Sequence, residues 1–237
     1  MLTQQDLDAV VLTLQLAACT TLVLLIIGTP LAWWLAHSKL RCKPLLEAVV
    51  ALPLVLPPTV LGFYLLLAFA PSSAFGHFWH SLTGHQLAFS FSALVIGSVL
   101  YSLPFVVQPL QASFEQLPSK LLEAAATMGA STLDQFLSII LPLTRRSFIT
   151  AAGLGFAHTI GEFGVVLMIG GNIPGETQVL SIALYDKVEA LQYNQAHTLA
   201  GALLIFSLLL LTLLYRTNKN NLASFSIKTK PSNTSIY

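Results

Sequence analysis

The sequence predicts an all-α integral membrane protein with five transmembrane helices. Of its 237 residues, 55% are hydrophobic and only 9% are charged, whereas a soluble domain has about 25% charged residues. The apolar runs are continuous rather than alternating, which is typical of membrane helices and not of a membrane barrel. The basic residues fall into groups along the chain. If the chain crosses the bilayer five times, almost all of these residues lie on the same side of it.

Five stretches are apolar enough to cross the bilayer, which takes about 20 helical residues. No Asp, Glu, Lys or Arg occurs in residues 9–38, 48–114 or 190–215. The first stretch follows an acidic leader, MLTQQDLDA, and is too long for a cleaved signal peptide, so it counts as a span. The expected spans cover residues 10–36, 48–70, 87–110, 148–171 and 196–215.

The distribution of Lys and Arg predicts the orientation of the chain. With five spans, Lys187 falls on one side and all other Lys and Arg residues fall on the opposite side. The positive-inside rule then places the N-terminus outside and the C-terminus in the cytoplasm. The basic residues expected in the cytoplasm are Lys39, Arg41, Lys43, Lys120, Arg145, Arg146, Arg216, Lys219, Lys228 and Lys230.

The chain is expected to form one membrane domain, residues 8–216, followed by a polar cytoplasmic tail, residues 217–237. The tail is rich in Asn, Ser and Lys, a composition typical of disorder. Residues 71–86 are expected to form an external loop whose aromatic side chains lie at the membrane interface.

A polar segment between the third and fourth spans has the pattern of two short helices. Ser119 is a candidate N-cap for the first helix, and Gly129 allows the chain to turn at its end. Ser131 and Asp134 form a capping-box pattern that starts a second helix, and Pro142 is expected to end it. The segment is therefore expected to project into the cytoplasm as a helix, a bend and a helix.

This segment has two interpretations. Its periodicity alone fits an amphipathic interfacial linker with no special function. The order Glu-Ala-Ala, a Gly six residues after the Glu, then Ile-x-Leu-Pro, favours a coupling helix that a separate ATPase contacts. This order resembles the permease subunits of binding-protein-dependent ABC transporters. The resemblance implies an ABC importer permease fold with a cytoplasmic coupling helix, and the expected coupling residues are Glu123, Ala124, Ala125, Gly129, Ala130, Ile139, Leu141 and Pro142.

Prolines interrupt the second span. Pro57 and Pro58 each remove a backbone donor and favour a bend, which in a membrane must face protein or a water-lined cavity. The bend serves either packing alone or a transport pathway, to which Thr59 would offer a hydroxyl.

The fourth span carries a carboxylate, Glu162, within the motif Gly-Glu-Phe-Gly. Ionisable groups inside a membrane are costly and are candidates for function. His158 lies four residues earlier and is expected on the same helical face, where it could pair with Glu162. The pair is either a structural contact between helices or a gate. Together with Pro57, Pro58 and Thr59, these two residues form the candidate pathway set.

Other classes of function lack the residues they need. No Gly-rich phosphate loop with the G-x-x-x-x-G-K-[ST] pattern occurs; Lys228-Thr229 comes closest, but Ile227 stands where Gly is required. No Ser-His-Asp or Cys-His arrangement and no metal-ligand framework is evident, so no catalytic, cofactor-binding or metal-binding residue is expected. ATP and Mg would bind to a partner ATPase.

The resemblance becomes narrower outside the polar segment. LPLVLPPTVLGFYLLL in the second span and GEFGVVLMIGGNIPGETQVLSIALY at 161–185 are similar to the molybdate permease group. This implies import of molybdate across a bacterial inner membrane by alternating access. It also implies a homodimer, two cytoplasmic ABC ATPase subunits and an external molybdate-binding protein.

Tungstate and sulfate permeases of the same family are alternatives. An ion-driven secondary transporter that uses Glu162 and His158 as a proton relay, or a membrane scaffold, is an alternative from another class. Because no Lys or Arg is expected within a span, the pathway offers an oxyanion no strong fixed cation other than a protonated His158. An oxyanion would then pass by hydroxyls, backbone N–H groups and helix ends, in a conduit that binds it weakly.

Overall fold

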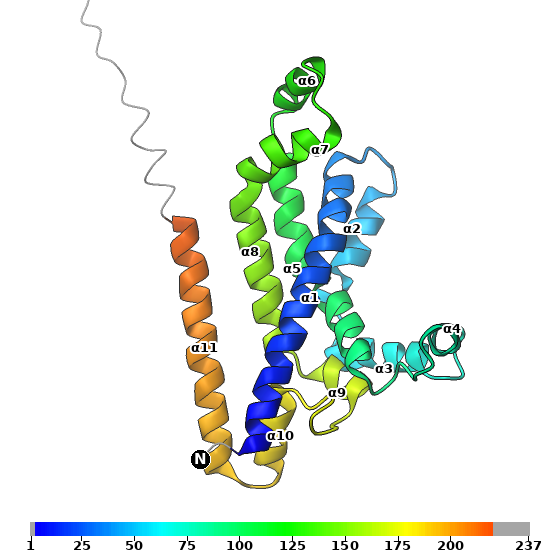
Figure 1. Cartoon of the computed structure of the whole chain (residues 1–237), viewed down its shortest axis with the longest axis vertical. Helices are drawn as coiled ribbons and strands as arrows, with labels where there is room; N and C mark the ends of the chain where they lie inside the picture. Colours follow the sequence, from blue (N-terminus) through cyan, green and yellow to red (C-terminus); the bar gives the residue numbers. More distant parts are fainter. Residues whose placement is uncertain (1–2, 220–237) are drawn as a thin grey trace, which may run out of the picture.

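The computed structural model describes residues 3–219, with side chains through residue 216. Every regular element in this part of the chain is helical (Figure 1). Three helices are long and apolar enough to cross a membrane without interruption. They are α1 (Gln4–His37), α5 (Phe91–Glu115) and α11 (Tyr193–Lys219).

Two further apolar segments are broken helices. The first runs through α2 (Lys43–Ala51) and the short η1 (Leu52–Leu54), then turns by 105° into α3 (Pro58–Phe69). Pro57 and Pro58 stand at this break, so the bend predicted from the prolines is confirmed. A second broken segment lies further along the chain. If each of the two broken segments crosses the membrane once, the described residues form five spans.

The second broken segment was expected to be one continuous span. Its elements are α7 (Thr132–Gln135), the π-helical η2 (Phe136–Ile140), α8 (Leu141–Ile160) and α9 (Gly164–Gly170). The chain bends by 61° between α8 and α9. Gly161 caps α8 and Gly164 opens α9, and glycine is a poor helix former, which explains the interruption.

The helices α1, α5 and α8 pack together along their lengths and form the central unit of the bundle. Small residues bring them close: a Cβ added at Gly28 of α1 would lie 3.3 Å from the Val106 side chain of α5, and one added at Gly155 of α8 would lie 2.9 Å from it. Val106 is fully buried between the two glycines. Close helix contact at glycine is a common way for membrane helices to gain dispersion energy.

Basic residues separate toward the two ends of the molecule. The C-terminal ends of α1, α5 and α11 and the start of α2 lie toward the same end as α6 (Ser119–Thr127), while α10 (Leu180–Glu189) and the start of α1 lie at the other (Figure 1). Lys187 on α10 is therefore far from the remaining described Lys and Arg residues, as predicted. Lys228 and Lys230 lie outside the described residues.

The N-terminal end of α1 is tied to α10 and to the loop before it. Lys187 Nζ lies 3.1 Å from the buried Asp6 carboxylate. The Gln178 amide donates to Asn172 at 2.8 Å and to Asp186 at 2.9 Å. These contacts fix the loop of residues 171–179.

Two expectations about the connecting segments need revision. Residues 71–86 are not simply a loop, because they contain α4 (Ala74–Thr83). Its N-cap Ser73 accepts a hydrogen bond from Gly76 N–H at 2.8 Å, and Gly84 ends it with φ of +74°. At the C-terminal side, residues 217–219 continue α11, and the rest of the expected tail, 220–237, lies outside the described residues.

Candidate functional site

A cavity of about 640 Å³ opens where the two broken segments meet. Its wall combines residues from α3, α5, α8, α9 and the break between α8 and α9. Four of the five candidate pathway residues line it; Pro57, the N-cap of α3, is the exception. The lining residues are Pro58, Thr59, Tyr101, Ala157, His158, Gly161, Glu162, Phe163, Gly164, Leu167 and Met168.

Close packing between α3 and α9 brings these residues together. A Cβ added at Gly164 would lie 2.7 Å from Pro58 Cβ, and one added at Gly62 would lie 2.7 Å from Met168 Cβ. Neither position leaves room for a larger side chain without a shift. The halves of the two broken segments therefore lie directly against each other beside the cavity.

Glu162 lies in the break between α8 and α9 and not within a helix. It is only 4% exposed, and within the described part of the chain neither carboxylate oxygen has a hydrogen-bond partner. The Ser98 hydroxyl of α5 approaches Glu162 but makes no hydrogen bond of ordinary geometry with it. The backbone of Glu162 is fixed instead, because the Ser181 hydroxyl donates to its carbonyl at 2.6 Å.

His158 does not pair with Glu162, so the predicted contact between them is wrong. Helix α8 ends at Ile160, and the four-residue spacing therefore no longer places the two side chains on one helical face. His158 Nδ1 lies 2.9 Å from the Ser102 hydroxyl of α5. Its ring stacks on Phe105 with a centroid distance of 3.9 Å and also contacts Tyr101 at 4.8 Å.

Ser98, Tyr101 and Ser102 are site residues that the sequence reasoning missed. All three lie on α5, in a span that was expected to carry no site residue. Ser98 and Ser102 are one helical turn apart and both fully buried. Two hydroxyls at this spacing in an apolar run mark a helix face that meets other polar groups, and this signal was available in the sequence.

The expected coupling residues lie at the other end of the molecule, in or beside α6, α7 and the start of α8. Gly129 has φ of +87° and turns the chain after α6, as predicted. The capping box of Ser131 and Asp134 is also confirmed: each backbone N–H donates to the other's side chain at 3.2 Å. The Ser131 hydroxyl also donates to the Asp134 carboxylate at 2.6 Å, and this bond, together with that from the Ser131 N–H, lowers the pKa of the Asp134 carboxyl, which lies outside the apolar segments.

Two of the helix boundaries predicted for this segment are wrong. Ser119 is the first residue of α6 and makes no capping hydrogen bond, because Pro118 occupies the N-cap. Pro142 does not end a helix, since the chain continues through it into α8. The Leu141 N–H donates to the Phe136 carbonyl, five residues back. This wider π-type turn provides room for a proline ring that would clash in a regular helix.

One face of α6 is apolar and exposed. Leu121, Ala124 and Met128 follow one another at spacings of three and four residues, and all three are exposed. Met128 is 83% exposed, and Leu133 of α7 is also largely exposed. Ala125, in contrast, points inward and is buried.

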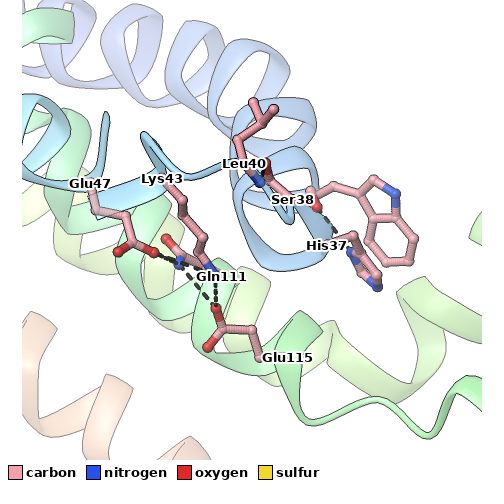
Figure 2. Close-up of polar contacts among 8 residues, drawn as sticks. His37, Ser38, Leu40, Lys43, Glu47, Gln111 and Glu115 are labelled. Atoms are coloured by element: carbon pink, nitrogen blue, oxygen red, sulfur yellow. Dashed lines mark hydrogen bonds and ion pairs between the residues drawn. The ribbon is translucent and has the colours of Figure 1, made fainter. Parts of the chain in front are cut away.

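A polar cluster joins α2 to α5 near the same end of the molecule. Figure 2 shows Lys43 between Glu47 and Glu115, at 3.6 and 3.2 Å from their carboxylates. Gln111 donates to Glu47 at 2.6 Å and to Glu115 at 3.1 Å. Val50 is the one buried residue of α2, so this cluster is a main attachment of α2 to the bundle.

The broken helices, the cavity between them and the exposed helix at one end define a membrane subunit of a transport system. Residues 28–220 match the family described as "Binding-protein-dependent transport system inner membrane component", and the chain belongs to this family. Its members are transport subunits rather than catalysts.

Relatives and solved structures agree with this family. The chain is 54% identical to "Molybdenum transport system permease protein ModB" of Azotobacter vinelandii, over 92% of this chain and 96% of that protein. It is 32% identical to "Sulfate transport system permease protein CysT" of Synechocystis sp., over 80% and 66% of the two chains. A crystal structure of a bacterial alginate ABC transporter in complex with a periplasmic protein superposes with a TM-score of 0.74. The superposition covers 92% of this chain and 80% of the transporter chain at 14% sequence identity, and it supports the fold.

The cavity predicts a difference in chemical accessibility between two exposed positions. In a variant whose Cys19 and Cys42 are replaced by serine, we expect Thr59→Cys to react in membranes with a charged, water-soluble thiol reagent, because Thr59 is exposed and lines the proposed site of passage. Leu22→Cys on α1 is the matched control: Leu22 is 61% exposed but lies on an apolar face suited to lipid. The labelled fraction is measured by mass spectrometry. Equal labelling at both positions would contradict a water-filled cavity.

Proposed function

We propose that this chain is the permease subunit of an ATP-driven importer that carries molybdate across the cytoplasmic membrane. The observation that supports this most strongly is the 54% identity with a molybdenum transport permease over nearly the whole chain. The sulfate permease is similar at a much lower identity. Tungstate, which has the same shape and charge as molybdate, is the alternative substrate.

The cavity is the proposed site of passage, with Pro57, Pro58, Thr59, His158 and Glu162 as its pathway or gate residues. None of the lining residues is Lys or Arg. A tetrahedral oxyanion would therefore meet hydroxyls, ring nitrogens and backbone N–H groups instead of a fixed cation, and it would pass the carboxyl group of Glu162. Such a conduit binds weakly and releases readily, so selectivity would reside mainly in an external molybdate-binding protein.

Alternating access would follow from the broken segments. Movement of the α6–α7 region is transmitted along α8 to its break at Gly161–Phe163, and from there to the paired helices α3 and α9. Two copies of the chain, two cytoplasmic ABC ATPase subunits and the external binding protein would form the complete importer. ATP and Mg would bind to the ATPases. An ion-driven transporter is less well supported. Its proton relay would require His158 to contact Glu162, and the two side chains form no hydrogen bond with each other.

The orientation and the coupling role belong to the same proposal. The N-terminus would lie outside, and the tail of residues 217–237 in the cytoplasm, because the basic residues gather at the α6 end. The coupling set of Glu123, Ala124, Ala125, Gly129, Ala130, Ile139, Leu141 and Pro142 would form the segment that the ATPase contacts, with the buried Ala125 holding α6 in place rather than touching the partner. The exposed apolar face of α6 supports this role, since an exposed apolar patch is typical of an interaction site.

Transport itself provides the direct test. In cells that lack their own molybdate permease, we expect this chain, with its partner subunits, to restore uptake of radioactive molybdate. The purified assembly should hydrolyse ATP faster when the loaded binding protein is present. Excess unlabelled tungstate and sulfate compete in separate arms, and the stronger competitor identifies any second substrate. Uptake that continues without an ATP-hydrolysing partner would contradict the proposal.

The proposed orientation can be tested with a natural cysteine. Cys42 is exposed and lies between α1 and α2, at the α6 end of the molecule. A membrane-impermeant thiol reagent should label it in inside-out vesicles and not in intact spheroplasts. Cys42→Ser is the control that accounts for labelling at Cys19. Labelling of Cys42 in intact spheroplasts would reverse the assignment of the two sides.

The coupling role predicts different effects for two alanines on opposite faces of α6. Ala124 lies between Leu121 and Met128 on the exposed apolar face, and Ala126 is also exposed, on another face. We expect Ala124→Arg to lower molybdate uptake about tenfold or more, as for a central contact residue of an interface. Ala126→Arg should have little effect. Both variants should reach the membrane in normal amounts, as measured by immunoblot. Normal uptake and ATPase stimulation with Ala124→Arg would count against the coupling face.

A further inference from the structure

Glu162 has one of the two carboxyl groups that are buried in the described part of the chain. The other, that of Asp6, is paired with Lys187 at 3.1 Å and accepts a hydrogen bond from the Thr3 N–H at 2.8 Å. Glu162 is 4% exposed, and neither of its carboxyl oxygens has a hydrogen-bond partner among the described residues. Its burial therefore needs a different explanation from that of Asp6.

No positive charge compensates an ionised Glu162. Residues 147–186 contain no Lys or Arg, and neither do residues 44–119. These two ranges include every residue of the cavity wall. None of the ion pairs found between the described residues involves Glu162.

Few titratable groups surround Glu162. Tyr101 of α5 and His158 of α8 line the same cavity, and Tyr185 of α10 contacts the aromatic ring of the residue that follows Glu162. Helices α3 and α9 add only uncharged, non-titratable residues to the wall. Helix α1 has no Asp, Glu, Lys or Arg in residues 9–37.

The two helix ends beside Glu162 do not compensate a negative charge either. Helix α8 ends at Ile160, and the free carbonyl groups at a helix C-terminus carry partial negative charge. Helix α9 begins at Gly164 after its N-cap Phe163, but the Glu162 side chain accepts a hydrogen bond from none of its N–H groups. A carboxylate at this position would therefore be buried without donors.

Burial of such a carboxylate is too costly, so a carboxyl group in this position takes a proton instead. The neutral acid then has an O–H group to donate. The Ser98 hydroxyl of α5 is fully buried, approaches Glu162 and has no hydrogen-bond partner among the described residues. Two buried groups without partners thus lie beside each other, and a small side-chain rotation joins the acid O–H to the Ser98 oxygen.

We propose that Glu162 carries a proton while the oxyanion passes, and that Ser98 is the positioning residue that accepts the hydrogen bond of this proton. This inference rests on the proposed transport function and adds a protonation requirement to it. An ionised Glu162 in the cavity wall would repel a molybdate dianion strongly, because the surroundings are apolar. A proton on Glu162 removes this repulsion without a fixed cation, which would slow release.

Infrared spectroscopy of the purified importer tests the protonated state directly. Near neutral pH we expect the C=O stretching band of a protonated carboxylic acid, which shifts in heavy water and is lost in Glu162→Gln. Asp6→Asn is the matched control, because Asp6 is equally buried but is paired with Lys187. The band should persist in this control. A spectrum that is the same in Glu162→Gln as in the unmodified chain would overturn the inference.

A second measurement covers the case in which Glu162→Gln does not accumulate in the membrane. The unmodified importer is then prepared with a heavy carbon isotope in all glutamate carboxyl groups. The band should move to lower frequency, because it belongs to a glutamic acid. A band that does not move, or no band at all, would overturn the inference.

Molybdate uptake tests whether transport requires the proton. The purified importer is placed in liposomes with the same pH on both sides and with ATP and the external binding protein in excess. Glu162→Gln keeps an uncharged side chain of the same shape. Near neutral pH its uptake should stay within about threefold of the unmodified chain, a smaller change than the loss of a hydrogen bond to a charged group produces. A larger loss would refute the requirement.

The dependence of uptake on pH has a defined sign. The protonated form is the competent one, so uptake by the unmodified chain should fall as the pH rises far enough to remove the infrared band. Glu162→Gln should not show this fall, since its amide does not ionise, while it retains Tyr101, His158 and Tyr185. The ratio of the two uptake rates therefore isolates Glu162. Uptake by the unmodified chain that continues after the band has disappeared would refute the requirement.

The role of Ser98 is tested by the frequency of the same band. Ser98→Ala should shift it, because the acid O–H loses its acceptor. Ser102→Ala, one helical turn away, is the control and should leave the band in place, because Ser102 bonds to His158. A residue with a purely structural role would not change the frequency, so an unshifted band in Ser98→Ala would refute the positioning role.

The outcomes separate this inference from the proposed function. If the unmodified importer takes up no molybdate, the proposed function fails, whatever the infrared spectrum shows. If it takes up molybdate but has no band that depends on Glu162, the proposed function stands and this inference alone fails.

Discussion

The structure depends on how two interrupted helices are sheltered. A break in a helix exposes backbone N–H and C=O groups, and hydrocarbon cannot satisfy them. The break after η1 and the break after α8 are brought together by the contacts of Gly62 with Met168 and of Gly164 with Pro58. Each interruption thus lies against protein or against the cavity. The closely packed helices α1, α5 and α8 provide the frame that makes this arrangement possible.

Features governed by local rules were predicted well from the sequence. The charge pattern separated Lys187 from the other described basic residues, and the prolines located the sharp bend before α3. The turn at Gly129 and the capping box at Ser131 also follow from the preferences of single residues and short spacings. These features require no knowledge of which helices meet.

Features that depend on tertiary contacts could not be predicted in the same way. The expected pairing of His158 with Glu162 assumed a helix that continues past Ile160, whereas the chain bends there to let α9 pack on α3. Pro142 was expected to end a helix, but a π-type turn accommodates it. The partner of His158 is Ser102, 56 residues away in the sequence. The spacing of Ser98 and Ser102 marks a polar face of α5, but it does not reveal which helix that face meets.

The attachment of α2 has a consequence for how the protein responds to its surroundings. Most of the central bundle is held by apolar packing, which added salt does not weaken, but α2 adds to the packing of Leu46 and Val50 a partly exposed ion pair between Lys43 and Glu115 of α5. Mobile ions screen such pairs, and the screening length falls to about 3 Å at 1 M salt. Osmotic stress that concentrates ions around this end would therefore weaken the polar part of the attachment of α2.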